Sequence, residues 1–460
     1  MITGAFIMPH PPIILPEIGR GEEKKLQKTI DACRKAAQMI AQLAPQTIVL
    51  TTPHSVTYAD YIHISPGENA EGDMGRFSAP GVKLRADCDT AFIAALEEEA
   101  LADGLAAGTL GTREKTLDHG AMIPLSFVNE QYKNYRLVHV GLSGLSFAQH
   151  YRFGMCVRKA AEKLGRSVVM LASGDLSHKL LESGPYGFDA AGALFDQEIT
   201  GAMAAGDFLR FLSIPPAIAD KAAECGLRSF IIMAGALDGQ AVNAQLLSYE
   251  GPFGVGYGVA SFIPKGPQPN RHFLDVFIKA EAMRLGVLRE AADPYVRLAR
   301  LSVEHFVKTG KRADLPVQLP EEMRRRRAGV FVSIKKDGQL RGCIGTIAPV
   351  TGCIAEEILK NAVSACSEDP RFEAVRPEEL GSLVYSVDVL SPPEPIASPQ
   401  ELDVRRYGVI VTAGRRRGLL LPNLEGVDTV QVQIDIARQK AGIRPGEQVS
   451  LERFEVVRHT

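Results

Sequence analysis

The sequence predicts an α/β N-terminal domain, in which helices flank a central sheet, joined to a smaller α+β C-terminal domain. Two observations lead to this prediction. Short apolar runs alternate with segments of helical periodicity up to residue 263, which is typical of a sheet buried between helices. A proline-rich segment then interrupts the pattern, and a hairpin with a different order of elements follows it.

The N-terminal part contains five apolar runs short enough to be strands. They cover 3–8, 47–52, 60–65, 136–142 and 167–173. Longer segments repeat apolar residues every three to four positions, as the buried face of a helix does. These helical segments cover 22–43, 88–106, 146–164, 189–212 and 221–237. Their alternation with the strands predicts an α/β domain at 1–263.

The domain boundary is expected at 264–275, where prolines and a glycine follow an apolar strand. The second domain would then span 276–460. Its clearest feature is a hairpin, in which strands 329–335 and 340–345 flank a Lys-Asp-Gly turn. The other elements expected there are helices 293–308, 353–366 and 428–441 and strands 382–389, 407–412 and 417–421.

Composition excludes several classes of protein. The 460 residues are 45% hydrophobic and carry a net charge of −2, so a disordered chain and a general nucleic-acid binder are not expected. No apolar stretch approaches the roughly 20 residues that span a bilayer, so no membrane partner is expected. The N-terminus does not resemble a signal peptide, and the seven cysteines are scattered. We therefore expect a cytoplasmic protein, and we expect it to form a homo-oligomer.

Three histidines follow three of the apolar strands. His10 comes after strand 3–8, His54 after 47–52, and His178 after 167–173. Open α/β sheets bind ligands beyond the carboxyl ends of their strands. If these strands are parallel neighbours, the three imidazoles converge on one pocket. Each histidine taken alone could equally be a structural, hydrogen-bonded residue.

Two imidazoles and one anionic side chain form the facial ligand set that suits ferrous iron, although another divalent metal or copper could bind there. The anion is expected to be Glu224 or Cys225, which lie side by side at the start of a helix. Asp175 could hold an imidazole in one tautomer. The third histidine would then act as an acid or base, and His119 is a further candidate from a loop.

The N-terminal motifs resemble the class III extradiol dioxygenases, the LigB-type superfamily, and the non-classical relative Memo. The resemblance covers roughly 1–263. It rests on Pro9-His10-Pro11-Pro12, Pro53-His54-Ser55, Asp118-His119-Gly120 and Ser173-Gly174-Asp175-Leu176-Ser177-His178. It implies that His10, His54 and Glu224 hold Fe(II), that His178 is the acid/base and that His119 lines the substrate pocket. In Memo a cysteine replaces the glutamate, as Cys225 could here.

The C-terminal part resembles the AMMECR-type domain. The motif Leu340-Arg341-Gly342-Cys343-Ile344-Gly345 and the later run Ser367-Glu368-Asp369-Pro370-Arg371-Phe372 carry this resemblance over about 290–455. The joined pair resembles the AmmeMemoRadiSam grouping, whose name implies a radical SAM partner. Because Arg341 and Cys343 are two positions apart on one predicted strand, the guanidinium is expected to activate the thiol as a catalytic group. A buried structural cysteine is the alternative.

Two functions follow from these features. The first is a non-haem Fe(II)-dependent extradiol dioxygenase-like oxidoreductase, which acts on dioxygen and a small aromatic or vicinal-oxygen substrate. Its protein groups would be His10, His54 and Glu224 or Cys225 as ligands, with His178 moving protons. The second is a Memo-like metal-binding or interaction module that works with a radical SAM protein and does not cleave catechols.

Overall fold

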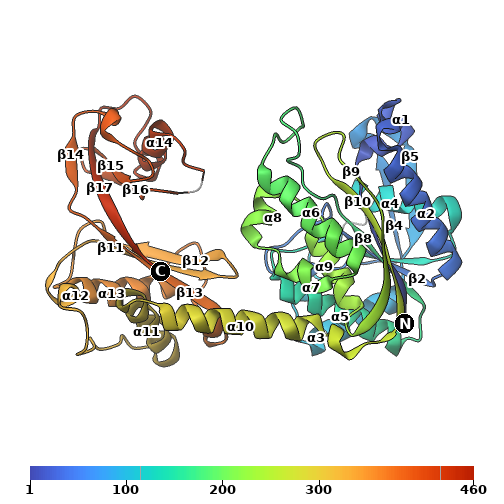
Figure 1. The fold of residues 1–460 in the computed structure, drawn as a ribbon, viewed down its shortest axis with the longest axis horizontal. Helices are drawn as coiled ribbons and strands as arrows, with labels where there is room; N and C mark the ends of the chain where they lie inside the picture. The colour runs from blue at the N-terminus through green and yellow to red at the C-terminus, as the bar shows by residue number, and fades with distance from the viewer. Residues whose placement is uncertain (114–115, 425) are drawn as a thin grey trace. The chain divides into compact units, whose positions relative to one another are not determined.

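The computed structural model describes residues 1–113, 116–424 and 426–460. The chain forms two compact units, Met1–Ala280 (unit 1) and Glu281–Thr460 (unit 2), whose elements are labelled in Figure 1. Unit 1 has a mixed sheet between helices, and unit 2 has an antiparallel sheet with helices of its own. The predicted combination of an α/β domain with an α+β domain is therefore confirmed.

The sheet of unit 1 has six strands in the order β7-β2-β8-β1-β10-β9. The four strands from β7 to β1 are parallel, whereas β10 and β9 complete the sheet in antiparallel pairs. Residues of β2 and β8 are buried along their whole length, which explains why these strands are continuous apolar runs. The strands are β1 (Ile2–Met8), β2 (Thr47–Thr52), β7 (Arg136–Gly141), β8 (Val168–Ser173), β9 (Gln240–Glu250) and β10 (Tyr257–Pro267).

Helices cover both faces of this sheet (Figure 1). One face packs against α2 (Gln27–Leu43) and α4 (His119–Gln131), and the other against α3 (Thr90–Ala102), α5 (Phe147–Lys163) and α9 (Leu227–Ala236). Near α9 lie α6 (Ala190–Ala205), α7 (Phe208–Ser213) and α8 (Pro216–Ala222). The remaining elements are α1 (Pro16–Gly19), the paired β3 (Ile62–His63) and β6 (Ala107–Gly108), and the hairpin β4 (Asn69–Met74) and β5 (Ala79–Asp87).

Several predicted elements have different bounds in the structure. The helix predicted at 189–212 is divided into α6 and α7, because Gly206 adopts a left-handed conformation and Asp207 caps the next helix. The helix predicted at 221–237 is divided in the same way into α8 and α9, with a left-handed Ala223 after α8. The strand predicted at 60–65 shortens to β3, and α4 and β9 were not predicted.

The segment predicted as a linker, 264–275, has regular structure instead. It contains the end of β10, a 3-10 turn at Pro269–Arg271 and the start of α10 (Phe273–Ala291). The β10–β9 pairing shifts register between Pro264 and Gly266, and Gly266 has a φ of 113°. A bulge of this kind accommodates a proline that lacks an N–H for the ladder. The prolines therefore mark a bulge at the end of a strand.

The sheet of unit 2 is antiparallel, in the order β12-β11-β13-β17-β15-β16, and β14 also pairs with β17. Because β17 pairs with β13 near its end and with β15 along its first half, one strand joins two sheet halves. The strands are β11 (Val330–Lys336), β12 (Gln339–Gly345), β13 (Leu383–Leu390), β14 (Glu394–Ile396), β15 (Tyr407–Ala413), β16 (Arg416–Leu420) and β17 (Ser450–His459). The predicted hairpin is confirmed as β11–β12.

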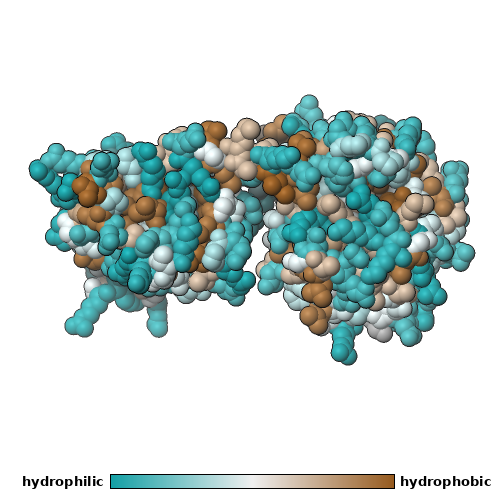
Figure 2. Space-filling view, turned by 90° about the horizontal axis from the view of Figure 1, so that it is seen from below, coloured by the Kyte–Doolittle hydropathy of each residue, from teal (hydrophilic) through white to brown (hydrophobic). Residues whose placement is uncertain are grey.

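Each half of this sheet has its own buried core. Helices α11 (Pro294–Thr309) and α13 (Ile354–Ser367) pack on the half that contains β11 and β13, while α14 (Val430–Lys440) packs on β15 and β16. The short α12 (Glu321–Arg325) contacts α13. In the view of Figure 2, hydrophilic residues cover most of the visible surface. Within the described part of the chain, no helix has the length and apolarity needed to cross a bilayer.

Candidate metal centre

The three histidine-bearing strands are adjacent and parallel, in the order β2-β8-β1. His10 lies two residues beyond β1, His54 two residues beyond β2, and His178 five residues beyond β8. All three therefore come from the carboxyl edge of the sheet, where open α/β sheets bind ligands.

His10, His54 and His119 form a cluster at this edge, in which one ring nitrogen from each residue lies within 4.8 Å of the others. The Nε2 atoms of His10 and His54 are 2.9 Å apart. His119, which was expected to line a substrate pocket, is thus placed beside the two expected ligands. It is the first residue of α4, and its ring stacks on that of His54 with centroids 4.1 Å apart.

A proline in α4 helps to orient the ring of His10. Pro124 has no N–H, so the Gly120 carbonyl lacks the helical donor that position 124 would otherwise supply. Ser173 at the end of β8 donates its hydroxyl proton to this carbonyl. The Ser173 oxygen then accepts the Nδ1–H of His10 at 2.8 Å. This leaves His10 Nε2 as an unprotonated nitrogen that faces the cluster.

Asp118 positions His119 by capping α4. Its carboxylate accepts hydrogen bonds from the backbone N–H of Ala121 at 3.2 Å and from the Thr52 hydroxyl at 2.7 Å. The carboxylate also lies 3.2 Å from His139 Nε2. Burial would raise the pKa of Asp118, but the hydrogen bond and charge of His139 outweigh it and hold this pKa well below its usual range. The helix that presents His119 therefore begins at a fixed anionic group.

The imidazoles of the cluster are neutral at neutral pH. Burial lowers the pKa of His10 and His54, and burial together with the charges of His54 and His10 lowers the pKa of His119 to about 3. A neutral imidazole is the form that binds a metal ion. Two nitrogens bound cis to one metal at about 2.1 Å lie about 3 Å apart, which matches the His10–His54 spacing. The donor set therefore fits a divalent metal.

Cys225, and not Glu224, faces this cluster. The Cys225 sulfur lies 3.6 Å from His10 Nε2, whereas the Glu224 carboxylate accepts the backbone N–H of Leu227 at 2.6 Å and caps α9. Of the two expected anionic ligands, the structure thus brings Cys225 to the cluster and holds the Glu224 carboxylate at the start of α9. Burial is the main reason that the pKa of Glu224 is raised to about 7.

A close backbone contact brings Cys225 to the cluster. A Cβ atom on Gly174 would lie 2.2 Å from the Cα of Gly226, so only glycine allows the loop after β8 to approach the start of α9 this closely. Burial, together with the charges of Asp175 and Glu224, raises the pKa of Cys225 well above its ordinary value. The thiol is therefore protonated at neutral pH unless a cation lies beside it.

Asp175, which was expected to hold an imidazole in one tautomer, contacts His10, while His178 has a different partner. Asp175 accepts the backbone N–H of His10 at 2.8 Å, and its other oxygen lies 4.0 Å from His10 Nε2. His178 donates Nδ1–H to the carbonyl of Ala223, which leaves its Nε2 as a proton acceptor. The ring of His178 also lies 5.0 Å from that of Tyr186. Backbone groups, and not Asp175, thus set the tautomer of His178.

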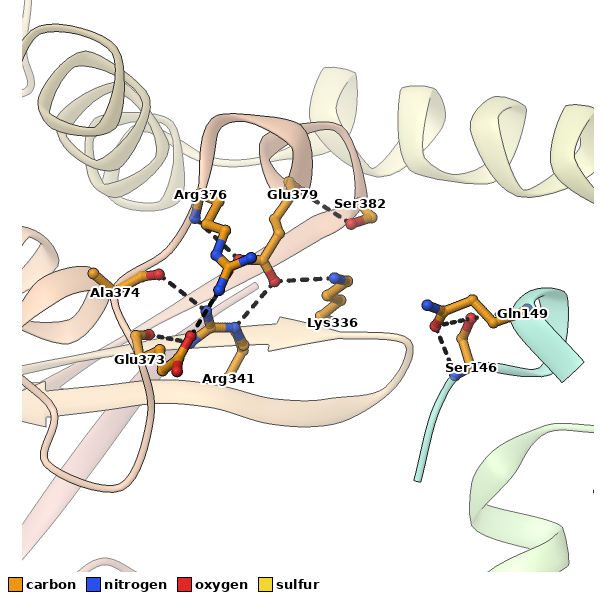
Figure 3. Close-up of polar contacts among 9 residues, drawn as sticks. All are labelled: Ser146, Gln149, Lys336, Arg341, Glu373, Ala374, Arg376, Glu379 and Ser382. Carbon is orange, nitrogen blue, oxygen red and sulfur yellow. Dashed lines mark hydrogen bonds and ion pairs between the residues drawn. The ribbon is translucent and has the colours of Figure 1, made fainter. Parts of the chain in front are cut away.

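Arg341 does not face the Cys343 thiol in unit 2. Figure 3 shows its guanidinium on Glu379, at 3.0 and 3.1 Å, with Lys336 on the same carboxylate. The pairing of β11 with β12 shifts register between Leu340 and Gly342, which makes Arg341 the extra residue of a bulge. In a regular strand, Arg341 and Cys343 would point to the same face of the sheet, but the bulge removes this alternation. Burial would raise the pKa of Glu379, but these hydrogen bonds lower it to about 2. Arg341 is therefore a structural clamp.

Comparison with known families agrees with this division of the chain. Residues 4–260 match the family described as the catalytic LigB subunit of aromatic ring-opening dioxygenase, which is more than half of the sequence. The chain belongs to the LigB family. Residues 296–459 match the AMMECR1 family, so a LigB domain is fused to an AMMECR1 domain. The resemblances inferred from the histidine motifs and from the Cys343 motif are both confirmed.

Relatives of this LigB protein include one with the same two-domain length. A protein of Clostridium acetobutylicum is 43% identical over 100% of this chain and 99% of its own length. A protein of Thermotoga maritima is 51% identical over 36% of this chain and 97% of its own length. Among solved structures, an uncharacterized Pyrococcus horikoshii protein is 34% identical with a TM-score of 0.34, and covers 36% of this chain and 88% of that structure.

Proposed function

We propose that the LigB domain is a metal-dependent, extradiol dioxygenase-like oxidoreductase that acts on a small aromatic or vicinal-oxygen substrate. The observation that carries this proposal is the convergence of His10, His54 and His119 through neutral ring nitrogens. These three residues would hold the metal, for which iron(II) is our first choice. Bound iron would supply a Lewis acid that can also exchange electrons with dioxygen.

The other side chains at the sheet edge would bind substrate and move protons. His178 Nε2 is free to take a proton from a substrate hydroxyl, because Nδ1 is committed to the Ala223 carbonyl. Phe77 lies with its ring centroid 5.1 Å from that of His119, and Tyr186 lies beside His178. These two aromatic rings would offer an apolar surface to a flat substrate.

Oxygen uptake tests this function. The full chain would be loaded with Fe(II) without air and assayed against a panel of catechols. His178→Ala should keep its iron and lose about 10²- to 10⁴-fold in rate, since only the proton transfer is removed. Loss of iron from this variant would make His178 a ligand instead. Absence of uptake by the iron-loaded wild type with every catechol would contradict the dioxygenase proposal.

A second function has one specific observation in its favour, the position of Cys225. A thiol 3.6 Å from His10 Nε2 suits a cysteine-ligated metal, including copper, in a Memo-like module that works with a radical SAM partner. Copper titration of the full chain distinguishes the two proposals. A sulfur-to-copper absorption band that disappears in Cys225→Ser would favour the module. Its absence, with stoichiometric iron binding in Cys225→Ser, would favour the three-histidine centre.

A further inference from the structure

The AMMECR1 domain contains a cavity of about 1210 Å³, and every residue that lines it belongs to unit 2. This volume is above the range of about 300–1,000 Å³ that is typical of small-molecule sites. The metal centre described above plays no part in it, because that centre lies in unit 1. The cavity is therefore a separate feature that requires its own explanation.

One face of the sheet forms the floor of this cavity. Cross-strand partners place Cys343 opposite Ser333, and Ser333 opposite Ser386, while Phe331 pairs with Asp388. All five residues line the cavity. The alternate residues of β11 point to the other face and pack in the core with α13; they are Val330, Val332 and Ile334. A sheet face that carries a thiol, two hydroxyls and a carboxylate is thus left facing open space.

The backbone of Cys343 is held on both sides. Asp369 accepts its N–H at 2.9 Å, and Arg371 donates to its carbonyl at 3.2 Å. Asp369 and Arg371 also pair with each other at 2.7 Å, so they act as one clamp on β12, which is the edge strand. The Ser333 hydroxyl donates to the Cys343 sulfur at 3.2 Å. The thiol is therefore fixed at the cavity wall.

The cavity wall carries a surplus of positive charge. Five arginines and two lysines line it, against two aspartates, and those aspartates already pair with Arg371 and Arg458. Among the described residues, Arg297, Lys335 and Lys440 have no carboxylate within ion-pair distance, although all three are exposed. A concave surface with several unpaired cations attracts anions.

Apolar side chains make up much of the remaining wall. They come from the floor strand β11, the segment after β12, the end of β16 and the segment after β16, and include Phe331, Ile347, Leu419, Leu421 and Leu424. Inorganic phosphate alone would leave this surface in contact with water, whereas an uncharged apolar molecule would leave the cations unpaired. A ligand that satisfies both parts of the wall has an apolar body and an anionic group.

We propose that this cavity binds a small organic anion, a carboxylate or phosphate ester with an apolar or aromatic body, in contact with the Cys343 thiol. Lys335, Lys440 and Arg297 bind the anionic group, and Phe331 and Leu421 contact the apolar body. The site is independent of the metal centre, so its existence does not rest on the proposed dioxygenase activity.

Alkylation of the full chain tests this proposal, with anilinonaphthalene sulfonate as the probe ligand. Cys343 and Cys225 are the partly exposed cysteines, and the other five are buried. Peptide mass spectrometry would follow the reaction of each with iodoacetamide. At a probe concentration ten times its dissociation constant, Cys343 should react about tenfold more slowly, because only the unoccupied fraction is accessible. Cys225 should react slowly, because its thiol is protonated at neutral pH, and at the same rate with and without the probe, so it serves as the internal reference.

Charge variants test the role of the cations. Lys335→Gln and Lys440→Gln should each weaken probe binding about two- to fivefold, whereas Lys311→Gln, an exposed lysine outside the cavity, should not. Protection is the ratio of rates with and without probe, so a change in the intrinsic reactivity of the thiol cancels. Phenylnaphthylamine, which has the same rings without the sulfonate, should bind more weakly than the sulfonate.

Four results would overturn the proposal. Unchanged alkylation of Cys343 at saturating probe would place the probe elsewhere. Equal protection of Cys225 would show a general effect on the chain and not occupancy of this cavity. Equal affinity for the charged and uncharged probes, or equal affinity of all three lysine variants, would mean that the cations do not select an anion.

Discussion

The two units of the chain treat buried acidic groups in opposite ways. In unit 1, neither Asp196 nor Glu224 forms an ion pair with an arginine or lysine among the described residues, and burial raises the pKa of each to about 7. In unit 2, Asp369 and Glu379 are hydrogen-bonded by Arg371 and Arg341, and their pKa values fall to about 2. Burial therefore keeps Asp196 and Glu224 of unit 1 close to neutral, although Asp118 in the same unit is ionised, while Asp369 and Glu379 of unit 2 are ionised partners of arginines.

This difference suits each unit to a ligand of opposite charge. Neutral imidazoles and a protonated thiol around His10 have lone pairs for a metal cation and no fixed cation to repel it. In the AMMECR1 domain the acids of the cavity are already paired with Arg371 and Arg458, so they do not pair with Lys335 and Lys440, which remain available to an anion. The experiments below test this contrast, beginning with the largest expected effect.

Removing a histidine of the cluster should have the largest effect. His54→Ala should reduce the affinity for Fe(II) by at least about 100-fold, because changes outside the ligand set already cost roughly 10- to 100-fold. The fold should survive, since His54 lies beyond the end of β2 and is not part of the hydrophobic core. Bound iron is measured by elemental analysis after anaerobic loading. The control is His305→Ala, an exposed histidine of α11, and stoichiometric iron in His54→Ala would refute the site.

Removing the hydroxyl that orients His10 should have a smaller effect on the same centre. Ser173→Ala frees the Nδ1 position, so His10 can take the other tautomer, and we expect a loss of about 10- to 100-fold in metal affinity. Ser261→Ala is the matched control, because Ser261 is buried in β10 of the same sheet and its hydroxyl has no hydrogen-bond partner among the described residues. Equal affinity in the two variants would show that the tautomer is not set by Ser173.

The contrast in buried acids predicts a pH dependence of folding for unit 1. Asp196 is 1% exposed, and its pKa is about 7 in the folded chain against an ordinary value of 3.8. The folded state therefore binds more protons than the unfolded state between these values, and its stability falls as pH rises through that window. We expect a loss of about 2 kcal/mol between pH 5 and 7.

Denaturant unfolding of unit 1 at several pH values measures this loss. Asp196→Asn, which cannot ionise, should remove the share of about 2 kcal/mol that Asp196 contributes, leave the share of Glu224, and leave the acidic behaviour of unit 2 unchanged. If the free energy of unfolding of Asp196→Asn depended on pH as strongly as that of the wild type, another group would be responsible for the titration. The contrast between the acidic groups of the two units would then be weaker.

Much of the fold was predictable because the strands of unit 1 are buried on both faces and are therefore continuous apolar runs. The elements that were missed lack this signal. Helix α4 contains Gly120 and Pro124, which normally argue against a helix, and β9 is an edge strand with exposed polar residues. In the structure Pro124 leaves the Gly120 carbonyl without a helical donor, so this carbonyl can accept the hydrogen bond from the Ser173 hydroxyl.

The candidate site was predictable to the extent that it depends on strand ends. His10, His54 and His178 follow from topology alone, whereas the choice between Glu224 and Cys225 depends on a contact between Gly174 and Gly226 that no local pattern reveals. The Asp118 cap was visible as an aspartate three residues before Ala121, although without a predicted helix it had no role.

The smallest expected effect concerns Arg341, whose pairing with Cys343 was predicted from strand alternation. Because the bulge directs Arg341 to Glu379, Arg341→Gln should change the alkylation rate of Cys343 by less than about twofold, as neither the charge nor the hydrogen bonds around the thiol are altered. The same variant should lose about 1–2 kcal/mol of stability at neutral pH, since the partly buried Glu379 loses two charge-assisted hydrogen bonds.

Arg371→Gln serves as the contrasting variant, because Arg371 donates to the Cys343 carbonyl and lies within electrostatic range of its thiol. It should slow alkylation of Cys343 more than Arg341→Gln does, as a thiol that loses a nearby cation forms less thiolate. If Arg341→Gln instead slowed alkylation as much as Arg371→Gln, the guanidinium would act on the thiol in solution. β12 would then have the regular alternation that the sequence predicts, with Arg341 and Cys343 on one face, and not the bulge.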